Sequence, residues 1–246
     1  MSALRSLLFL LFQLVVTPLY AAAMLLMAWS PRITTYRMAA SWCAVNLWGA
    51  RTICGIKWQV DGSENVPEGS KLSPHIVLSK HSSTWETLSL NFYFPPLAFV
   101  AKKELLSIPF FGWGFATASP ITIDRKAGVD AMQQIATQGR ERFKQGFWIA
   151  IYPEGTRIKA GTRAKYKTGG ARLAITLDVP VIPAPALCTD ATRSADAPAA
   201  HSCRPCQANG SAAPAVRLQQ FVSAFGVNGV VESICVIVLS TMRGSR

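Results

Sequence analysis

A histidine and a carboxylate lie close together in the segment KHSSTWE, residues 80–86. His81 precedes Glu86 by five residues and directly follows a short apolar run. A carboxylate at such a turn can reach back to the imidazole, orient it and raise its basicity, as a general base for a hydroxyl group requires. Ser83 and Glu86 also have the spacing of a helix capping box, so a purely structural role for the carboxylate stays open.

A second segment places Asp124 and Arg125 between a short apolar run and a stretch with helical spacing. An arginine at that junction can clamp a phosphate together with the backbone amides of a helix N-terminus. A surface pair between Asp124 and Arg125 explains the same residues without a ligand. The segment is therefore compatible with an anion site and with a plain surface turn.

A third segment, YPEGTR at residues 152–157, ends a strongly apolar run. Gly155 permits close approach of the backbone, and Thr156 and Arg157 offer a hydroxyl and a planar guanidinium to an anion. Glu154 is not obviously needed to hold a helix or a strand. The alternative is an ordinary turn, and only the neighbouring motifs distinguish the two interpretations.

The segments that position these motifs are short apolar runs separated by turns. Buried strands are predicted at residues 75–79, 97–101, 121–123, 147–152 and 179–183. A helix is predicted over 127–145, with Gly146 at its expected end. Strands that alternate with helices indicate an α/β fold with a largely parallel sheet covered by helices on both faces. In such folds the functional residues lie where the strands end. Two prolines in 179–183 restrict that strand to an edge or a sheet end.

The first long apolar run, residues 7–29, contains no charged residue. Its 23 residues are enough to cross a hydrocarbon core of about 30 Å as a helix, even with Pro18 inside. A cleaved signal peptide is the alternative, with Arg5 as its basic end and the alanines at 21–23 as its cleavage region. The run continues past those alanines, which favours a retained anchor. Basic residues without acids follow it, which favours a cytoplasmic catalytic domain.

Residues 33–58 form a second apolar stretch that contains three tryptophans and two arginines. It is too charged for a confident span, so we expect a helix that lies in or dips into the membrane interface. An ordinary core helix with buried tryptophans is the alternative.

Composition narrows the class of protein. Of 246 residues, 25 are Lys or Arg and 13 are Asp or Glu, giving a formal charge of +12, while 50% are hydrophobic. Disorder of the whole chain is excluded, because it requires low hydrophobicity. Such hydrophobicity also argues against a freely soluble cytosolic enzyme. The positive charge indicates an anionic partner, either nucleic acid, anionic lipid or a phosphorylated substrate. The six cysteines form no regular disulfide framework.

The ordered set of His81 with Glu86, IDR at 123–125, PEGTR at 153–157 and VPVIP at 179–183 resembles the 1-acylglycerol-3-phosphate O-acyltransferase family. The segment AKKELLSIPFFGWG at 101–114 looks like the lysine-containing segment of that family. The resemblance covers roughly residues 1–183. It implies a glycerolphosphate acyltransferase-like α/β fold preceded by membrane helices, and acyl transfer from a thioester to the 2-hydroxyl of lysophosphatidic acid.

The resemblance also implies the roles of individual residues. His81 matches the catalytic base, and Glu86 stands where the family usually has the shorter Asp. The implied substrate-binding residues are Lys103, Arg125, Glu154, Gly155, Thr156 and Arg157. Direct attack on a thioester requires no acyl-enzyme, metal or cofactor, and the donor is acyl-CoA or acyl carrier protein. The implied location is a membrane of the bacterial inner-membrane type, with the active site facing the cytoplasm.

The chain divides by composition into three parts. We predict membrane-anchoring helices at 1–58, an acyltransferase domain at 59–183 that is incomplete at its C-terminal end, and an atypical tail at 184–246. The tail has no Lys, Trp or Tyr and four of the six cysteines, as a frameshifted or disordered extension would. Cys203 and Cys206, with Cys188 and His201, have zinc-ligand spacing, but the composition favours an unstructured tail without metal.

Two other functions fit parts of the sequence. The same fold can act on another lysolipid, of the ornithine lipid or lysophosphatidylcholine type. Alternatively, the chain is a catalytically impaired basic protein that binds anionic membrane. The basic residues between 157 and 172, without an acid among them, are expected to face lipid headgroups. Nucleic acid is disfavoured as a partner, because no nucleic-acid-binding motif accompanies the charge.

Overall fold

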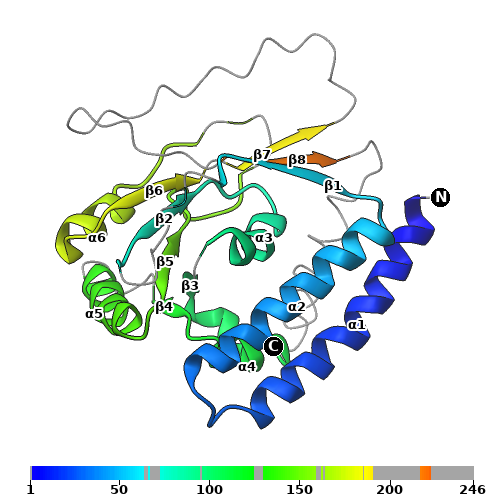
Figure 1. Ribbon diagram of the computed structural model, residues 1–246, viewed down its shortest axis with the longest axis horizontal. Helices are drawn as coiled ribbons and strands as arrows, with labels where there is room; N and C mark the ends of the chain where they lie inside the picture. Colours follow the sequence, from blue (N-terminus) through cyan, green and yellow to red (C-terminus); the bar gives the residue numbers. More distant parts are fainter. Residues whose placement is uncertain are drawn as a thin grey trace, which may run out of the picture.

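The computed structural model describes residues 2–63, 66, 73–94, 96–124, 130–158, 162, 164–184, 186–190 and 217–222. Within them, a five-stranded sheet carries helices on both faces, and two long helices lie beside it (Figure 1). A separate three-stranded sheet lies beyond one edge. The predicted α/β class, with an apolar N-terminal helix, is confirmed.

The five-stranded sheet is parallel throughout and has the order β4-β3-β5-β2-β6. Its strands are β2 (Ile76–Ser79), β3 (Leu97–Lys102), β4 (Ile121–Ile123), β5 (Trp148–Ile151) and β6 (Val181–Ala184). All five coincide with predicted strands to within two residues. β6 pairs only with β2 in this sheet, so the expected edge position of the proline-containing strand is confirmed.

Side chains alternate between two apolar cores, one on each face of the sheet. On one face, Val77, Leu97 and Trp148 pack with residues of α2 and α3. On the other, Ile76 and Ile149 pack with residues of α5 and α6. Strands buried on both faces read as continuous apolar runs, which is why they were visible in the sequence.

The remaining helices are short, and the sequence predicted only one of them, α5. They are α3 (Trp85–Tyr93), α4 (Phe111–Thr117), α5 (Asp130–Lys144) and α6 (Gly169–Leu177), with the 3₁₀ helix η2 (Lys103–Ser107) before α4. α5 confirms the predicted helix, and Gly146 follows its end with a φ of 81°, a conformation that glycine adopts without strain.

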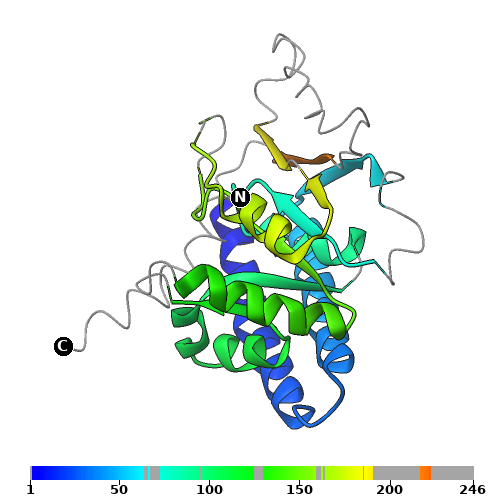
Figure 2. The same cartoon turned by 90° about the vertical axis from the view of Figure 1, so that its left-hand side faces the viewer.

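The helices α1 (Ser2–Leu26) and α2 (Arg32–Thr52) run side by side as a hairpin (Figures 1 and 2). Gln13 donates a hydrogen bond to Asn46 across the hairpin over 2.8 Å, and the Phe12 ring fills the space above Gly49. α1 is long and apolar enough to cross a membrane over residues 3–26. Many leucines on its outer face are exposed, which suggests membrane association.

The second predicted apolar helix extended too far. α2 ends at Thr52, and Trp58 belongs to the strand β1 (Lys57–Asp61). One side of α2 is buried against the sheet, as Tyr36 and Cys43 show, whereas Trp48 is 60% exposed. One side of the helix therefore packs in the core, as the alternative interpretation predicted, and the location of its other side in a membrane interface stays a prediction.

The three-stranded sheet has the order β1-β8-β7. It joins β1 to β7 (Ala186–Asp190) and β8 (Arg217–Val222), with β8 antiparallel to β1 and parallel to β7. Two segments of the predicted tail are therefore strands. Ala184 ends β6, and the rest of residues 184–246, including the candidate zinc ligands Cys203, Cys206 and His201, lies outside the described residues.

Candidate active site

The turn after β2 and the turn after β5 meet at the carboxyl edge of the sheet. The two strands are parallel neighbours in which Leu78 lies opposite Ile151, so they end side by side. The backbone N–H of His81 donates a hydrogen bond to Glu154 Oε2 over 2.6 Å. The backbone N–H of Ile158 donates to the His81 carbonyl over 2.8 Å. Two motifs that are far apart in the sequence are thus held together.

The imidazole of His81 is half-buried and lies nearly parallel to the Tyr152 ring, with 4.0 Å between ring centroids and 16° between planes. Burial, and after it the positive charge of Arg157, lowers the pKa of His81 to about 4. The ring is therefore neutral near pH 7, the form that accepts a proton. Its Nδ1 atom is buried and has no hydrogen-bond partner among the described residues.

Glu86 is 1% exposed in the first turn of α3 and bonds back to the backbone N–H of Ser83, as the glutamate of a capping box does. Its carboxylate accepts hydrogen bonds from the backbone N–H groups of Ser82 and Ser83, over 2.9–3.1 Å, and from the Ser83 hydroxyl over 2.9 Å. Burial raises the pKa of Glu86, and these donors oppose that shift. The structure thus shows the local structural role, and orientation of His81 by Glu86 stays a prediction.

Glu154 is also buried, at 4% exposure, but it bonds to a different turn. One carboxylate oxygen accepts the His81 N–H, and the other, Oε1, is buried without a hydrogen-bond partner among the described residues. A carboxylate so placed fixes the backbone of the candidate base. No local sequence signal shows this contact, because its two residues are 73 positions apart. The predicted part of Glu154 in substrate binding stays a prediction.

The remaining PEGTR residues form a turn with a positive rim. Gly155 has a φ of 69°, and a Cβ at this position would stand 3.1 Å from Lys167 Nζ. The backbone N–H of Lys167 donates to the Pro153 carbonyl over 2.8 Å, which fixes this lysine beside the turn. Thr156 is exposed, and Arg157 is half-buried and close enough to affect His81 electrostatically. The turn therefore brings Arg157 close to the candidate base and has Lys167 and the Thr156 hydroxyl beside it.

The other predicted anion-binding residues follow β3 and β4. Lys103 is exposed at the start of η2, directly after β3, and therefore lies at the same carboxyl edge as His81. Arg125 lies outside the described residues, although β4 ends just before it, with Ile123 opposite Lys102. The sheet thus brings the loop of Lys103 to the edge, and no contact between Lys103 and His81 is seen.

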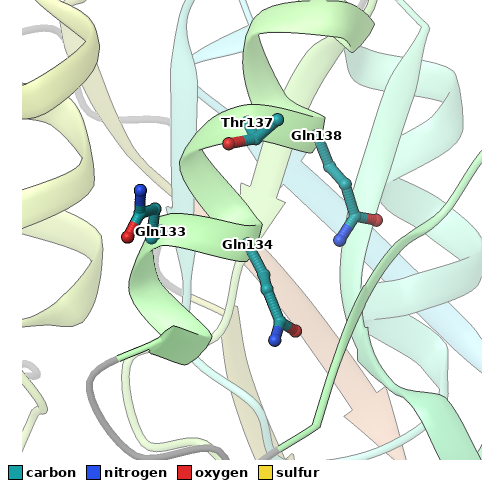
Figure 3. Close-up of a pocket in the computed structure, with 4 residues that line it drawn as sticks. All are labelled: Gln133, Gln134, Thr137 and Gln138. Carbon is teal, nitrogen blue, oxygen red and sulfur yellow. The ribbon is translucent and has the colours of Figure 1, made fainter.

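A hollow on the surface of α5 lies away from these motifs. It is lined by Gln133, Gln134, Thr137 and Gln138 (Figure 3). The Gln138 side chain accepts a hydrogen bond from the Thr122 N–H over 3.1 Å and donates to the Thr122 carbonyl over 2.9 Å. Gln138 thus pairs with the free backbone of the edge strand β4, so its role here is structural.

A comparison with protein families gives a class for a chain with this fold and these motifs. A family model described as "Acyltransferase" matches residues 57–185, slightly more than half of the chain. The chain belongs to this family.

Individual relatives are more specific. A 1-acyl-sn-glycerol-3-phosphate acyltransferase of Pseudomonas aeruginosa is 47% identical over 143 residues, which cover 58% of this chain and 54% of that protein. A 1-acyl-sn-glycerol-3-phosphate acyltransferase alpha of mouse is 31% identical over 135 residues, covering 54% and 46%. The chain thus spans about half the length of the curated relatives it matches. The resemblance seen in the sequence is confirmed.

The fold also matches a solved structure. The crystal structure of the 1-acyl-sn-glycerophosphate (LPA) acyltransferase PlsC from Thermotoga maritima aligns with a TM-score of 0.58. The alignment covers 95% of this chain and 93% of that chain, at 21% sequence identity. At that identity the likeness concerns the fold alone, and it includes the N-terminal helices.

Proposed function

We propose that this protein transfers an acyl chain from an acyl thioester to the sn-2 hydroxyl of lysophosphatidic acid, giving phosphatidic acid for phospholipid biosynthesis. Two of its relatives carry the name of this activity. The observation that carries the proposal is the pair of hydrogen bonds that holds the His81 turn against the Arg157 turn. A base for a hydroxyl and a cation for a phosphate then lie within one site.

The chemical step needs one proton acceptor. In the proposed step, the His81 imidazole takes the proton of the 2-hydroxyl as the oxygen attacks the thioester carbonyl carbon. A C–O bond forms, the C–S bond breaks, and the imidazolium returns its proton to the leaving thiolate. The lowered pKa of His81 keeps the imidazole neutral in the free protein, and it also makes the ring a weaker base than an ordinary imidazole. The step requires no acyl-enzyme, cofactor or metal, and acyl-CoA or acyl carrier protein supplies the thioester.

Substrate binding is assigned to the positive rim of the site. Arg157 offers a planar guanidinium to the phosphate, with Gly155 and Thr156 beside it. Lys103 and Arg125 follow neighbouring strands and complete the proposed anion site. Glu154 contributes by fixing the His81 backbone, and Glu86 by fixing the turn that follows His81.

The membrane supplies the lipid substrate. We propose that α1 remains in the membrane and that the catalytic domain lies on the cytoplasmic side of a bacterial inner membrane. The arginines of α2, at 32, 37 and 51, follow the apolar helix and support that orientation. The exposed cations Lys165, Lys167 and Arg172 are proposed to face anionic lipid headgroups.

A thin-layer assay tests this function directly. Membranes that contain the protein are incubated with labelled lysophosphatidic acid and either acyl-CoA or acyl carrier protein thioester. We expect labelled phosphatidic acid with at least one donor. In a competition arm, unlabelled lysophosphatidic acid should reduce the signal more than lysophosphatidylcholine or a lyso-ornithine lipid does. No product with either donor, or stronger competition by another lysolipid, would reject the assignment.

A further inference from the structure

Tyr152 lies directly against the proposed base. It follows the last residue of β5, and its ring is nearly parallel to the His81 imidazole at 4.0 Å between centroids. Its hydroxyl makes a 2.8 Å hydrogen bond with the Thr87 hydroxyl. On the same helix as Thr87, Glu86 holds the turn that follows His81. The strand end and the helix therefore fix the two rings relative to each other.

The proposed reaction places a positive charge on the His81 ring, and among the described residues no carboxylate is seen to bond to that ring directly. Arg157 opposes that charge, as the lowered pKa of His81 indicates. The carboxylate of Glu86 bonds to the turn of Ser82 and Ser83, and that of Glu154 bonds to the His81 backbone N–H. On the α2 side, Cys43 is buried near Tyr152 and has its pKa raised to about 12, so it is neutral.

The face of an aromatic ring can stabilise the positive charge of the imidazolium. The faces of tyrosine and phenylalanine rings carry partial negative charge and attract a cation within about 6 Å of the ring centre. This attraction strengthens where water is excluded, and the Tyr152 ring is partly buried against the core, with burial raising the pKa of its phenol. The attraction acts on the imidazolium far more than on the neutral imidazole. It therefore favours the step in which the base gains its proton.

We infer that the ring face of Tyr152 stabilises the imidazolium that His81 forms during acyl transfer, with Thr87 holding the phenol in place. Tyr152 is thus a positioning residue that acts through His81 and does not itself touch the substrate. This inference rests on the proposed function, because it requires His81 to act as the base.

The test replaces Tyr152 by phenylalanine and then by phenylalanine analogues with one, three and five ring fluorines. Fluorination weakens the negative charge of the ring face while nearly preserving its size. We expect Tyr152→Phe to retain most of kcat, and kcat to fall with each added fluorine by a total of about two- to thirty-fold. The KM values for lysophosphatidic acid and for the thioester should stay unchanged.

Two controls keep the result interpretable. The same analogues at Phe147, a buried ring that contacts Tyr36 and not His81, should leave kcat unchanged. Thermal unfolding should show that all variants are folded. A kcat that does not vary with fluorination at position 152, in an active enzyme that loses activity in His81→Ala, would overturn the inference alone. Absence of acyl transfer by the wild-type protein would reject the proposed function and the inference with it.

Discussion

Two buried carboxylates hold the candidate site, and they do so over different distances along the chain. Glu86 bonds within its own turn, to Ser82 and Ser83. Glu154 bonds to the backbone of His81, in a turn that follows another strand. The first contact shapes the His81 turn, and the second fixes that turn against the Arg157 turn. The difference shows that local contacts determine the conformation of each motif, whereas long-range contacts hold the motifs together in one site.

The first prediction concerns the pH dependence of stability through His81. Because the folded pKa is about 4 and the ordinary value is 6.5, the unfolded chain binds the proton more readily between these values. The free energy of unfolding is therefore highest above pH 6.5, and this contribution to it is lost as the pH falls from 6.5 through about 4. We expect this contribution to amount to about 3 kcal/mol in wild-type protein. Denaturant unfolding in detergent micelles measures it, and His81→Ala should remove this part of the dependence.

The second prediction concerns the other turn. Arg157→Ala should raise KM for lysophosphatidic acid about ten- to a hundred-fold, because a charge-assisted contact to the phosphate is lost. KM for the acyl donor should change little. Steady-state kinetics with each substrate varied in turn measures both constants. The exposed Arg140 of α5, which has no proposed part in binding, provides a matched control in Arg140→Ala, which should leave both constants near their wild-type values. An unchanged KM for lysophosphatidic acid in Arg157→Ala would remove this residue from the phosphate site.

The third prediction concerns the long-range carboxylate. Glu154→Ala leaves the His81 N–H without its acceptor, so the free energy of unfolding should fall by about 1–3 kcal/mol and kcat should also fall. Glu154→Gln retains an oxygen that can accept the N–H and should recover much of both losses. Denaturant unfolding and steady-state kinetics measure the two effects. A rise in KM for lysophosphatidic acid, with stability and kcat unchanged, would instead show that Glu154 binds substrate.

The fourth prediction concerns the local carboxylate and has the smallest expected effect. Glu86→Ala removes the capping contacts and should lower the free energy of unfolding by about 1 kcal/mol. Glu86→Gln can still accept hydrogen bonds from Ser83, so it should keep stability and most of kcat. Glu86→Asp gives the shorter acid as a further comparison. If Glu86→Gln loses kcat strongly while stability holds, and Glu86→Asp restores it, Glu86 orients His81 as the sequence also allowed.

The contrast between the local contacts of Glu86 and the long-range contact of Glu154 also explains which features could be predicted from the sequence. The capping-box spacing of Ser83 and Glu86 is visible in the sequence, and the structure shows its hydrogen bonds. The five strands were predictable because burial on both faces leaves continuous apolar runs. The end of α2 was not, since Trp58 continues an apolar stretch into a strand.

The site's assembly could not be predicted from the sequence, because it depends on strand order. β2 and β5 are neighbours although β3 and β4 lie between them in the chain. Only that order brings Glu154 to the His81 backbone and the Tyr152 ring to the imidazole. Tyr152 can be seen before PEGTR in the sequence, but its contact with the His81 ring cannot. The pairing of β7 and β8 with β1 likewise joins distant segments that carry no common pattern.

The central claim is that His81 is the base for acyl transfer to lysophosphatidic acid. Its most direct test is the kcat of purified protein in lipid vesicles, measured as phosphatidic acid formed and thiol released in equal amounts. His81→Ala should lower kcat by about 10²–10⁴-fold or more with the protein still folded. His75→Gln, which changes a buried histidine at the opposite end of β2, should retain near-wild-type kcat. A His81→Ala protein that forms phosphatidic acid at the wild-type rate would contradict the claim.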